Sequence, residues 1–201
     1  MSPENIHRFW FSDALTDPAR AKQRMAFWFH SDAETDESIA QRFAPAVRDA
    51  AQGALSGWQA DPQSCLALII VLDQFPRNIH RGTPAAFEHD RQALGVTRQG
   101  IAAGHLGALQ TVEQAFFLMP FQHVEDLDSQ REGVIFFEKM VDDAPIEWRS
   151  GAEGFVSYAR QHLEIVERFG RFPHRNTILG RVSTPAESEY LASHGESFGQ
   201  K

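Results

Sequence analysis

Residues 62–75 read PQSCLALIIVLDQF, and this stretch decides the fold. Every position from Cys65 to Leu72 is apolar, so a helix here needs packing neighbours on all sides. We therefore expect a central helix over 62–75. The apolar run is far shorter than the roughly 20 residues that span a bilayer, so we expect no membrane segment. Pro76 should end the helix, because the residue before a proline is disfavoured in the helical conformation.

Helix-start signals recur on both sides of this stretch. A capping side chain precedes a proline at Asp17-Pro18, Asp61-Pro62, Thr83-Pro84 and Thr184-Pro185. Strand signals are scarce, and no Asn-Gly or Asp-Gly dipeptide occurs. We expect helices near 3–12, 18–30, 32–56, 62–75, 84–103, 110–119, 126–143, 151–169 and 185–194. The sequence thus predicts an all-α protein of about nine helices, with one domain over residues 1–201.

The composition argues against several classes of protein. The formal charge of −8 disfavours broad nucleic-acid binding, which needs a net basic face. The single Cys65 allows no disulfide within the chain. The N-terminus lacks the charged start and apolar stretch of a signal peptide. We expect a cytoplasmic protein with no nucleic-acid or membrane partner, and a homodimer stays open.

Two segments of the chain resemble each other. Residues 75–85 read FPRNIHRGTPA and residues 172–186 read FPHRNTILGRVSTPA; we call them the first and second Phe-Pro segments. Both follow an apolar helical run, contain Arg-Asn and end at Thr-Pro-Ala. We expect two loops close together on one face of the molecule. Loops that concentrate polar side chains are common binding elements.

Asp73 and Gln74 lie at the predicted end of the central helix. Asp73 continues the apolar stripe of Leu66 and Ile69, so we expect it to be at least partly buried. A carboxylate there needs partners, and Arg77 and Arg81 are the nearest by sequence. Two interpretations stay open: a structural ion pair, or a carboxylate held for binding or proton transfer.

The histidines also allow two interpretations each. His162 lies on an apolar helix stripe, where it is either a satisfied core residue or faces a cleft between helices. His123 follows the predicted helix breaker Pro120, and with Glu125 it could share a proton or a metal ion. The acidic residues that follow are also typical of ordinary helix capping.

The second Phe-Pro segment and its flank concentrate positive charge. The candidates there are Arg171, His174, Arg175, Asn176 and Arg181. Such a cluster can bind an anion through bidentate hydrogen bonds, although a solvated loop would also tolerate it. With Arg77 they supply more positive charge than Asp73 and Glu125 cancel, and a proton on His174 would strengthen anion binding.

Specific catalytic signatures are absent from the sequence. There is no HExxH, paired CxxC, GxSxG, P-loop or strand-borne GxGxxG motif. We therefore expect no metal and no cofactor.

Several blocks of the sequence together resemble one family. They are residues 7–11 (HRFWF), 72–78 (LDQFPRN), 86–87 with Asp90, Pro120 with His123, Glu125, Asp126 and Gln130, and then His162, 168–176 (RFGRFPHRN), 179–181 and Glu187. In combination they are similar to the DUF924 family of uncharacterised bacterial proteins. The chain departs from that pattern at Val124, where the family commonly has a serine. The resemblance implies a tetratricopeptide-like antiparallel helical superhelix, and it implies no reaction.

Three functions remain open from the sequence. The first is a protein that binds an anionic small molecule or an acidic peptide in a cleft between helices. The second is a hydrolase- or lyase-like enzyme, with His123, Glu125, His174 and Asp73 as catalytic candidates. The third is a structural or oligomeric module without a ligand. The candidate ligand-binding residues are Asp73, Gln74, Arg77, Asn78, His123, Glu125, His162, Arg171, His174, Arg175, Asn176 and Arg181.

Overall fold

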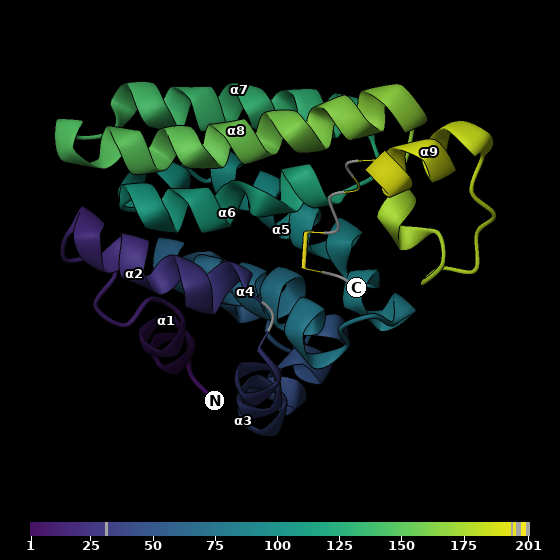
Figure 1. Ribbon diagram of the computed structural model, residues 1–201. Helices are drawn as coiled ribbons and strands as arrows, with labels where there is room; N and C mark the ends of the chain where they lie inside the picture. Colours follow the sequence, from purple (N-terminus) through teal and green to yellow (C-terminus); the bar gives the residue numbers. More distant parts are fainter. Residues whose placement is uncertain (31, 194, 196–197, 200–201) are drawn as a thin grey trace.

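A computed structural model describes residues 1–30, 32–193, 195, 198 and 199, and these residues form helices without a strand (Figure 1). The α-helices are α1 (Pro3–Phe11), α2 (Pro18–Phe29), α3 (Ala33–Ala51), α4 (Pro62–Ile79), α5 (Asp90–Ala102), α6 (Thr111–His123), α7 (Leu127–Asp143), α8 (Ile146–Phe169) and α9 (Pro185–Ser193). Short 3₁₀ helices are η1 (Ser56–Ala60), η2 (Pro84–Phe87), η3 (Leu106–Ala108) and η4 (Pro173–Arg175). The prediction of an all-α fold is confirmed.

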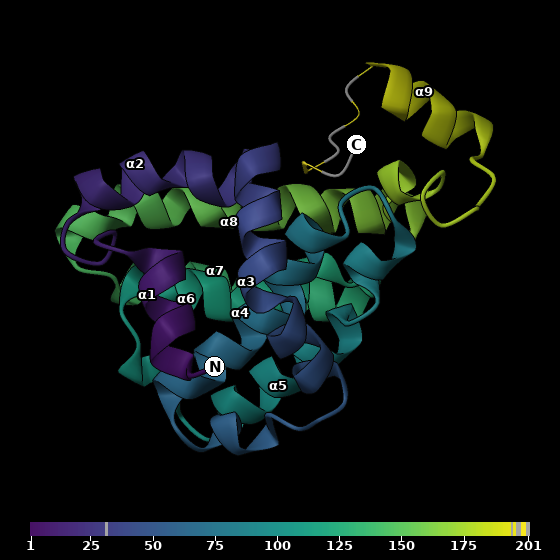
Figure 2. The same ribbon diagram turned by 90° about the horizontal axis from the view of Figure 1, so that it is seen from below.

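The helix α4 is the centre of the packing, as the apolar stretch predicted. Its residues from Cys65 to Pro76 are all buried. It contacts α1, α3, α5 and α6, so neighbours surround it (Figures 1 and 2). Asp61 begins the helix by accepting a hydrogen bond from the backbone N–H of Ser64.

The prediction that prolines end two of the helices is wrong. The helix α4 continues through Pro76 to Ile79, and α6 continues through Pro120 to His123. Proline removes one N–H donor from a helix, so Pro76 leaves the carbonyl of Leu72 without its usual helical partner. Burial against neighbouring helices outweighs the lost bond. Asp73 therefore lies inside α4, and the polar start of the first Phe-Pro segment is helical.

Two further helix boundaries differ from expectation. The predicted helix 84–103 is divided into η2 and α5. The helix α8 begins at Ile146, five residues before the predicted start, because Pro145 at its N-cap supplies a starting signal ahead of Ser150.

Helices that follow one another in the chain pack together from α3 to α8. Figure 1 shows α7 and α8 side by side above α6, with α9 at the far end. The two N-terminal helices pack instead on helices that are distant in the chain. The helix α1 packs on α4, and α2 packs on α8 (Figure 2). The tetratricopeptide-like superhelix stays a prediction. Within the described residues, no helix combines the length and apolar character needed to cross a membrane.

Candidate functional site

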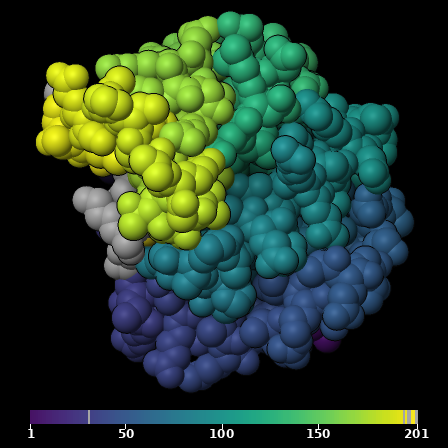
Figure 3. Space-filling view, turned by 90° about the vertical axis from the view of Figure 1, so that its right-hand side faces the viewer, coloured from purple at the N-terminus to yellow at the C-terminus, as the bar shows by residue number. Residues whose placement is uncertain are grey.

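A cavity of about 300 Å³ lies where four helices and both Phe-Pro segments meet. The polar part of its wall comes from Gln74, Arg77 and Asn78 on α4, from Gln122 and His123 on α6, and from His174 and Arg175 on η4. The structure thus brings the two Phe-Pro segments together, as expected. Figure 3 shows the C-terminal part of the chain, in yellow, against the teal residues that follow α4. We call this space the central cavity.

Asp73 lies directly behind the wall of the central cavity. Its side chain is fully buried, and its Oδ1 lies 2.7 Å from Nδ1 of His123. Gln74 donates to its Oδ2 at 2.5 Å, and Nη1 of Arg77 lies 3.5 Å from Oδ1. Burial by itself raises the pKa of Asp73, but the charges and hydrogen bonds of these partners outweigh it and hold the pKa at about 2. The carboxyl group is therefore ionised at neutral pH.

His123 is a neutral imidazole held by this carboxylate. Burial and the charge of Arg77 lower its pKa more than Asp73 raises it. Since Asp73 can only accept, Nδ1 of His123 carries the proton and donates it in the hydrogen bond. Its Nε2 has no hydrogen-bond partner in the described part of the chain, and the side chain is 12% exposed on the cavity wall. An unprotonated nitrogen thus lies beside the central cavity.

The arginines of the cavity are paired with aspartates. Arg77 and Arg175 share Asp90, with Nη1 atoms 2.8 and 3.1 Å from its two carboxylate oxygens. Arg81 binds Asp36 through Nε and Nη2 at 2.6 and 2.8 Å, although we expected it beside Asp73.

These pairs cancel the charge of the cavity wall. Arg77, Arg81 and Arg175 are matched by Asp36, Asp73 and Asp90, so the expected surplus of positive charge is wrong for this cavity. Asp36 and Asp90 come from α3 and α5, and sequence proximity pointed to neither.

His162 and His174 complete the polar wall. His162 is buried and its Nδ1 donates to the Tyr158 carbonyl at 2.8 Å, so it is both satisfied by its own helix and adjacent to the cavity. Burial lowers the pKa of His162 well below 6.5. Burial, followed by the charge of Arg175, lowers the pKa of His174 to about 3. This shift favours a neutral His174 in the folded protein, and the expected gain of a proton on anion binding stays a prediction.

The family described as "Bacterial protein of unknown function (DUF924)" matches residues 6–195. The chain belongs to this family. A solved structure titled "Structure of Protein of Unknown Function ATU0120 from Agrobacterium tumefaciens" is 35% identical, with a TM-score of 0.79 over 94% of this chain and 96% of that one. No curated protein matches the chain.

Other predicted site residues of this DUF924 protein hold the second Phe-Pro segment in place. Glu125 accepts from the Phe172 backbone N–H at 2.8 Å and from Arg181 at 2.6 and 2.9 Å. Arg171 forms a bidentate pair with Glu187 at 2.7 and 2.9 Å. Glu125 fastens the segment to the turn between α6 and α7, and Arg171 fastens its flank to α9; none of these side chains lines the central cavity.

Asn176 and Glu125 also have partners inside the protein. Asn176 is buried and its Nδ2 donates to Oγ of Ser183 at 3.0 Å, inside the second Phe-Pro segment. Glu125 and His123 have separate hydrogen-bond partners, Arg181 and Asp73, so the alternative in which these two share a proton or a metal ion stays open. Among the described residues, no cluster of three or more His, Cys, Asp or Glu side chains has the arrangement to hold a metal ion.

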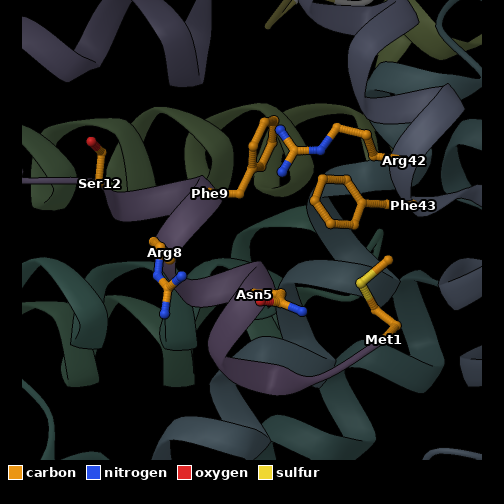
Figure 4. Close-up of a pocket in the computed structure, with 7 residues that line it drawn as sticks. All are labelled: Met1, Asn5, Arg8, Phe9, Ser12, Arg42 and Phe43. Carbon is orange, nitrogen blue, oxygen red and sulfur yellow. The ribbon is translucent and has the colours of Figure 1, made fainter.

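A second hollow lies at the N-terminal end of the molecule (Figure 4). The arginine of α3 that lines it, Arg42, places its guanidinium 4.4 Å from the Phe9 ring centre and 5.1 Å from that of Phe43. The described side chains around it include no histidine or carboxylate, and it is more open than the central cavity. His123, with Asp73 behind it, lies at the central cavity and not at this hollow.

Proposed function

We propose that this DUF924 protein is an enzyme that acts on a small molecule in the central cavity, with His123 as its general base. The observation that carries the proposal is the Asp73–His123 pair. Its Nδ1–H···Oδ1 hydrogen bond fixes the tautomer in which Nε2 has a lone pair at the cavity wall. A base within hydrogen-bond reach of its substrate and free of a proton at neutral pH is suited to general-base catalysis.

Asp73 would support the base in two ways. It orients the imidazole, and it stabilises the positive charge that His123 acquires when it takes a proton. The carboxylate is already ionised and fully buried, so no water has to be displaced from it during the reaction.

The residues that line the cavity limit the types of reaction that it could catalyse. The described lining residues include no serine, threonine or cysteine, so His123 would take its proton from the substrate or from a water molecule. Both routes fit hydrolase- or lyase-like chemistry, one of the three functions that the sequence left open.

The size and charge of the cavity restrict the class of molecule that could be its substrate. A space of about 300 Å³ suits a small molecule at the lower end of the usual range for ligand pockets. Because the arginines are paired with aspartates, an acidic substrate would bind by directed N–H donors, with a weak dependence on ionic strength. An anionic small molecule therefore fits better than a highly charged ligand or an acidic peptide.

The test is consumption of compounds from a defined mixture of small metabolites, followed by mass spectrometry. We expect the wild type to consume at least one compound, and His123→Gln to slow this by roughly 10²–10⁴-fold, the usual contribution of a general base. Asp73→Asn should slow it by a smaller factor if it folds. The matched control is His7→Gln, since His7 pairs with Glu113 at 2.6 Å outside the cavity.

Two results would contradict the proposal. Equal rates for His123→Gln and the wild type would exclude His123 as the base. Thermal stabilisation by a compound that is never consumed would instead favour a binding protein for an anionic small molecule.

A further inference from the structure

Phe198 and Gly199, near the end of the chain, line the central cavity. The Phe198 ring stacks on His162, with ring centres 3.8 Å apart and planes at 27°. It also meets the edge of His174, with ring centres 5.5 Å apart. The Gly199 carbonyl accepts a hydrogen bond from Nη1 of Arg81. One planar ring and one oxygen acceptor thus occupy two neighbouring positions of the site.

The backbone conformation of Phe198 indicates that contacts with His162 and Arg81 hold this dipeptide at the cavity. Phe198 has a φ of +47°, in the left-handed region that a bulky L-residue rarely adopts. Arg81 is already paired with Asp36, and its remaining donor takes the Gly199 oxygen. Ring stacking and the arginine hydrogen bond therefore outweigh an unfavourable backbone conformation.

Residues that line the same cavity hold buried polar atoms without hydrogen-bond partners in the described part of the chain; they include Nδ1 of His174. Oε1 of Gln122 and Nε of Arg175 are buried, and neither has a hydrogen-bond partner in the described part of the chain. The two residues are only 7% and 6% exposed. An unpaired buried donor or acceptor destabilises a protein, so a ligand that pairs with both atoms would gain affinity. Gln122 needs an N–H or O–H donor, and Arg175 needs an oxygen acceptor.

We propose that the substrate of this cavity is an aromatic carboxylic acid that also carries an N–H or O–H group, such as an aromatic hydroxy acid or N-acyl amino acid. Its ring takes the place of Phe198 on His162, and its carboxylate takes the place of the Gly199 carbonyl on Arg81. Its hydroxyl or amide hydrogen donates to Oε1 of Gln122, and its hydroxyl or acyl oxygen accepts from Nε of Arg175. Phe198 and Gly199 are then internal competitors of the substrate. This inference deepens the proposed function and rests on the central cavity being the active site.

Calorimetry with four probes tests the ligand class: phenyllactate, N-acetylphenylalanine, cyclohexyl-lactate and phenylethanol. We expect the first two to bind. Cyclohexyl-lactate should bind at least fivefold more weakly because it cannot stack flat on His162. Phenylethanol should not bind measurably because it has no carboxylate. Equal affinity for all four, or no binding of the two aromatic acids to any variant, would overturn the inference.

Variants of the full chain test each position. Phe198→Ala should tighten phenyllactate binding at least fivefold by removing the competitor, whereas the matched control Leu191→Ala should leave it unchanged. Arg81→Gln and Arg81→Lys should each weaken binding at least tenfold, and the helical circular dichroism of both should equal that of the wild type. An unchanged affinity in Phe198→Ala would refute the internal competition. If Arg81→Gln unfolds, Arg81→Lys still tests the contact. An unchanged affinity of Arg81→Lys for phenyllactate would show that the ligand carboxylate does not bind Arg81.

The result separates this inference from the proposed function. His123→Gln should still bind phenyllactate while it loses turnover. If the protein consumes only non-aromatic compounds and this consumption requires His123, the proposed ligand class is wrong. The role of His123 as general base would then still be supported. Binding of aromatic acids without any consumption would contradict the enzyme and leave the ligand class standing.

Discussion

Nδ1 of His123 lies 2.7 Å from Oδ1 of Asp73, although fifty positions separate the two residues in the chain. The contact joins α6 to α4, the two helices with the most continuous burial. It places a proton-accepting nitrogen at a cavity and an ionised carboxylate behind it. The same contact therefore serves the packing of two core helices and the chemistry of the site.

Asp73→Ala should destabilise the protein by about 3–5 kcal/mol, because removal of one member of a buried pair leaves the partner charge of Arg77 partly uncompensated. Urea unfolding of the purified variant measures the change in the free energy of unfolding. Asp142→Ala is the control, since Asp142 is exposed on α7 and should change stability by no more than about 0.5 kcal/mol. An unchanged midpoint for Asp73→Ala would show that its carboxylate contributes nothing to the fold.

Acidification below pH 6.5 should destabilise the protein through its buried histidines. The pKa of His174 is about 3 when folded against 6.5 when unfolded, so the unfolded state binds the proton first as the pH falls. Between pH 7.5 and pH 5 this one residue should lower the free energy of unfolding by up to about 2 kcal/mol. His162 and His123 add losses in the same direction.

The measurement is urea unfolding at the two pH values for the wild type and His174→Gln. The variant should show a smaller difference between pH 7.5 and pH 5. Asp73 does not contribute over this range, because its pKa lies below 4 in both states and its stabilisation is lost only in stronger acid. An identical pH difference in the variant would show that His174 is protonated in the folded protein.

Gly133→Ala should destabilise the protein by about 1–3 kcal/mol through overpacking. A Cβ at Gly133 of α7 would lie 2.5 Å from Cβ of Phe121 on α6, two positions before His123. The control is Gly151→Ala in α8, where a Cβ meets nothing within 4 Å and the higher helix propensity should stabilise by roughly 0.5–1 kcal/mol. Thermal unfolding should shift in opposite directions for the two variants. A shift in the same direction would contradict the close packing of α6 and α7 at this point.

Gln130→Met should destabilise the turn that carries His123. The buried Gln130 on α7 donates from Nε2 to the carbonyls of Gln122 at 2.7 Å and Val124 at 2.8 Å. These carbonyls belong to the end of α6. Each carbonyl that loses its donor should lower the free energy of unfolding by about 1–3 kcal/mol. The control Gln41→Met removes an exposed hydrogen bond to Glu37 and should change the urea midpoint little. Equal midpoints for the two variants would contradict a role for Gln130 in holding the turn.

The sequence by itself determined the helical fold and its central helix. Capping residues before prolines and the apolar run from Cys65 to Leu72 are local features, and local hydrogen bonding and burial act on them directly. It also placed polar residues of both Phe-Pro segments at a common site, because their composition differs from the helices around them. The burial of Asp73 followed from the apolar stripe of its own helix.

Only the tertiary structure decided which polar groups meet. The proximity of Asp73 and His123, and the sharing of Asp90 by Arg77 and Arg175, depend on how α4, α5, α6 and η4 pack. Sequence distance pointed to Arg77, which does contact Asp73, and to Arg81, which pairs with Asp36 of α3. Packing against distant parts of the chain also explains why α4 continues through Pro76. Burial against several helices outweighs one missing backbone hydrogen bond. Charge pairing and helix ends in a core depend on distant neighbours, and no local pattern encodes them.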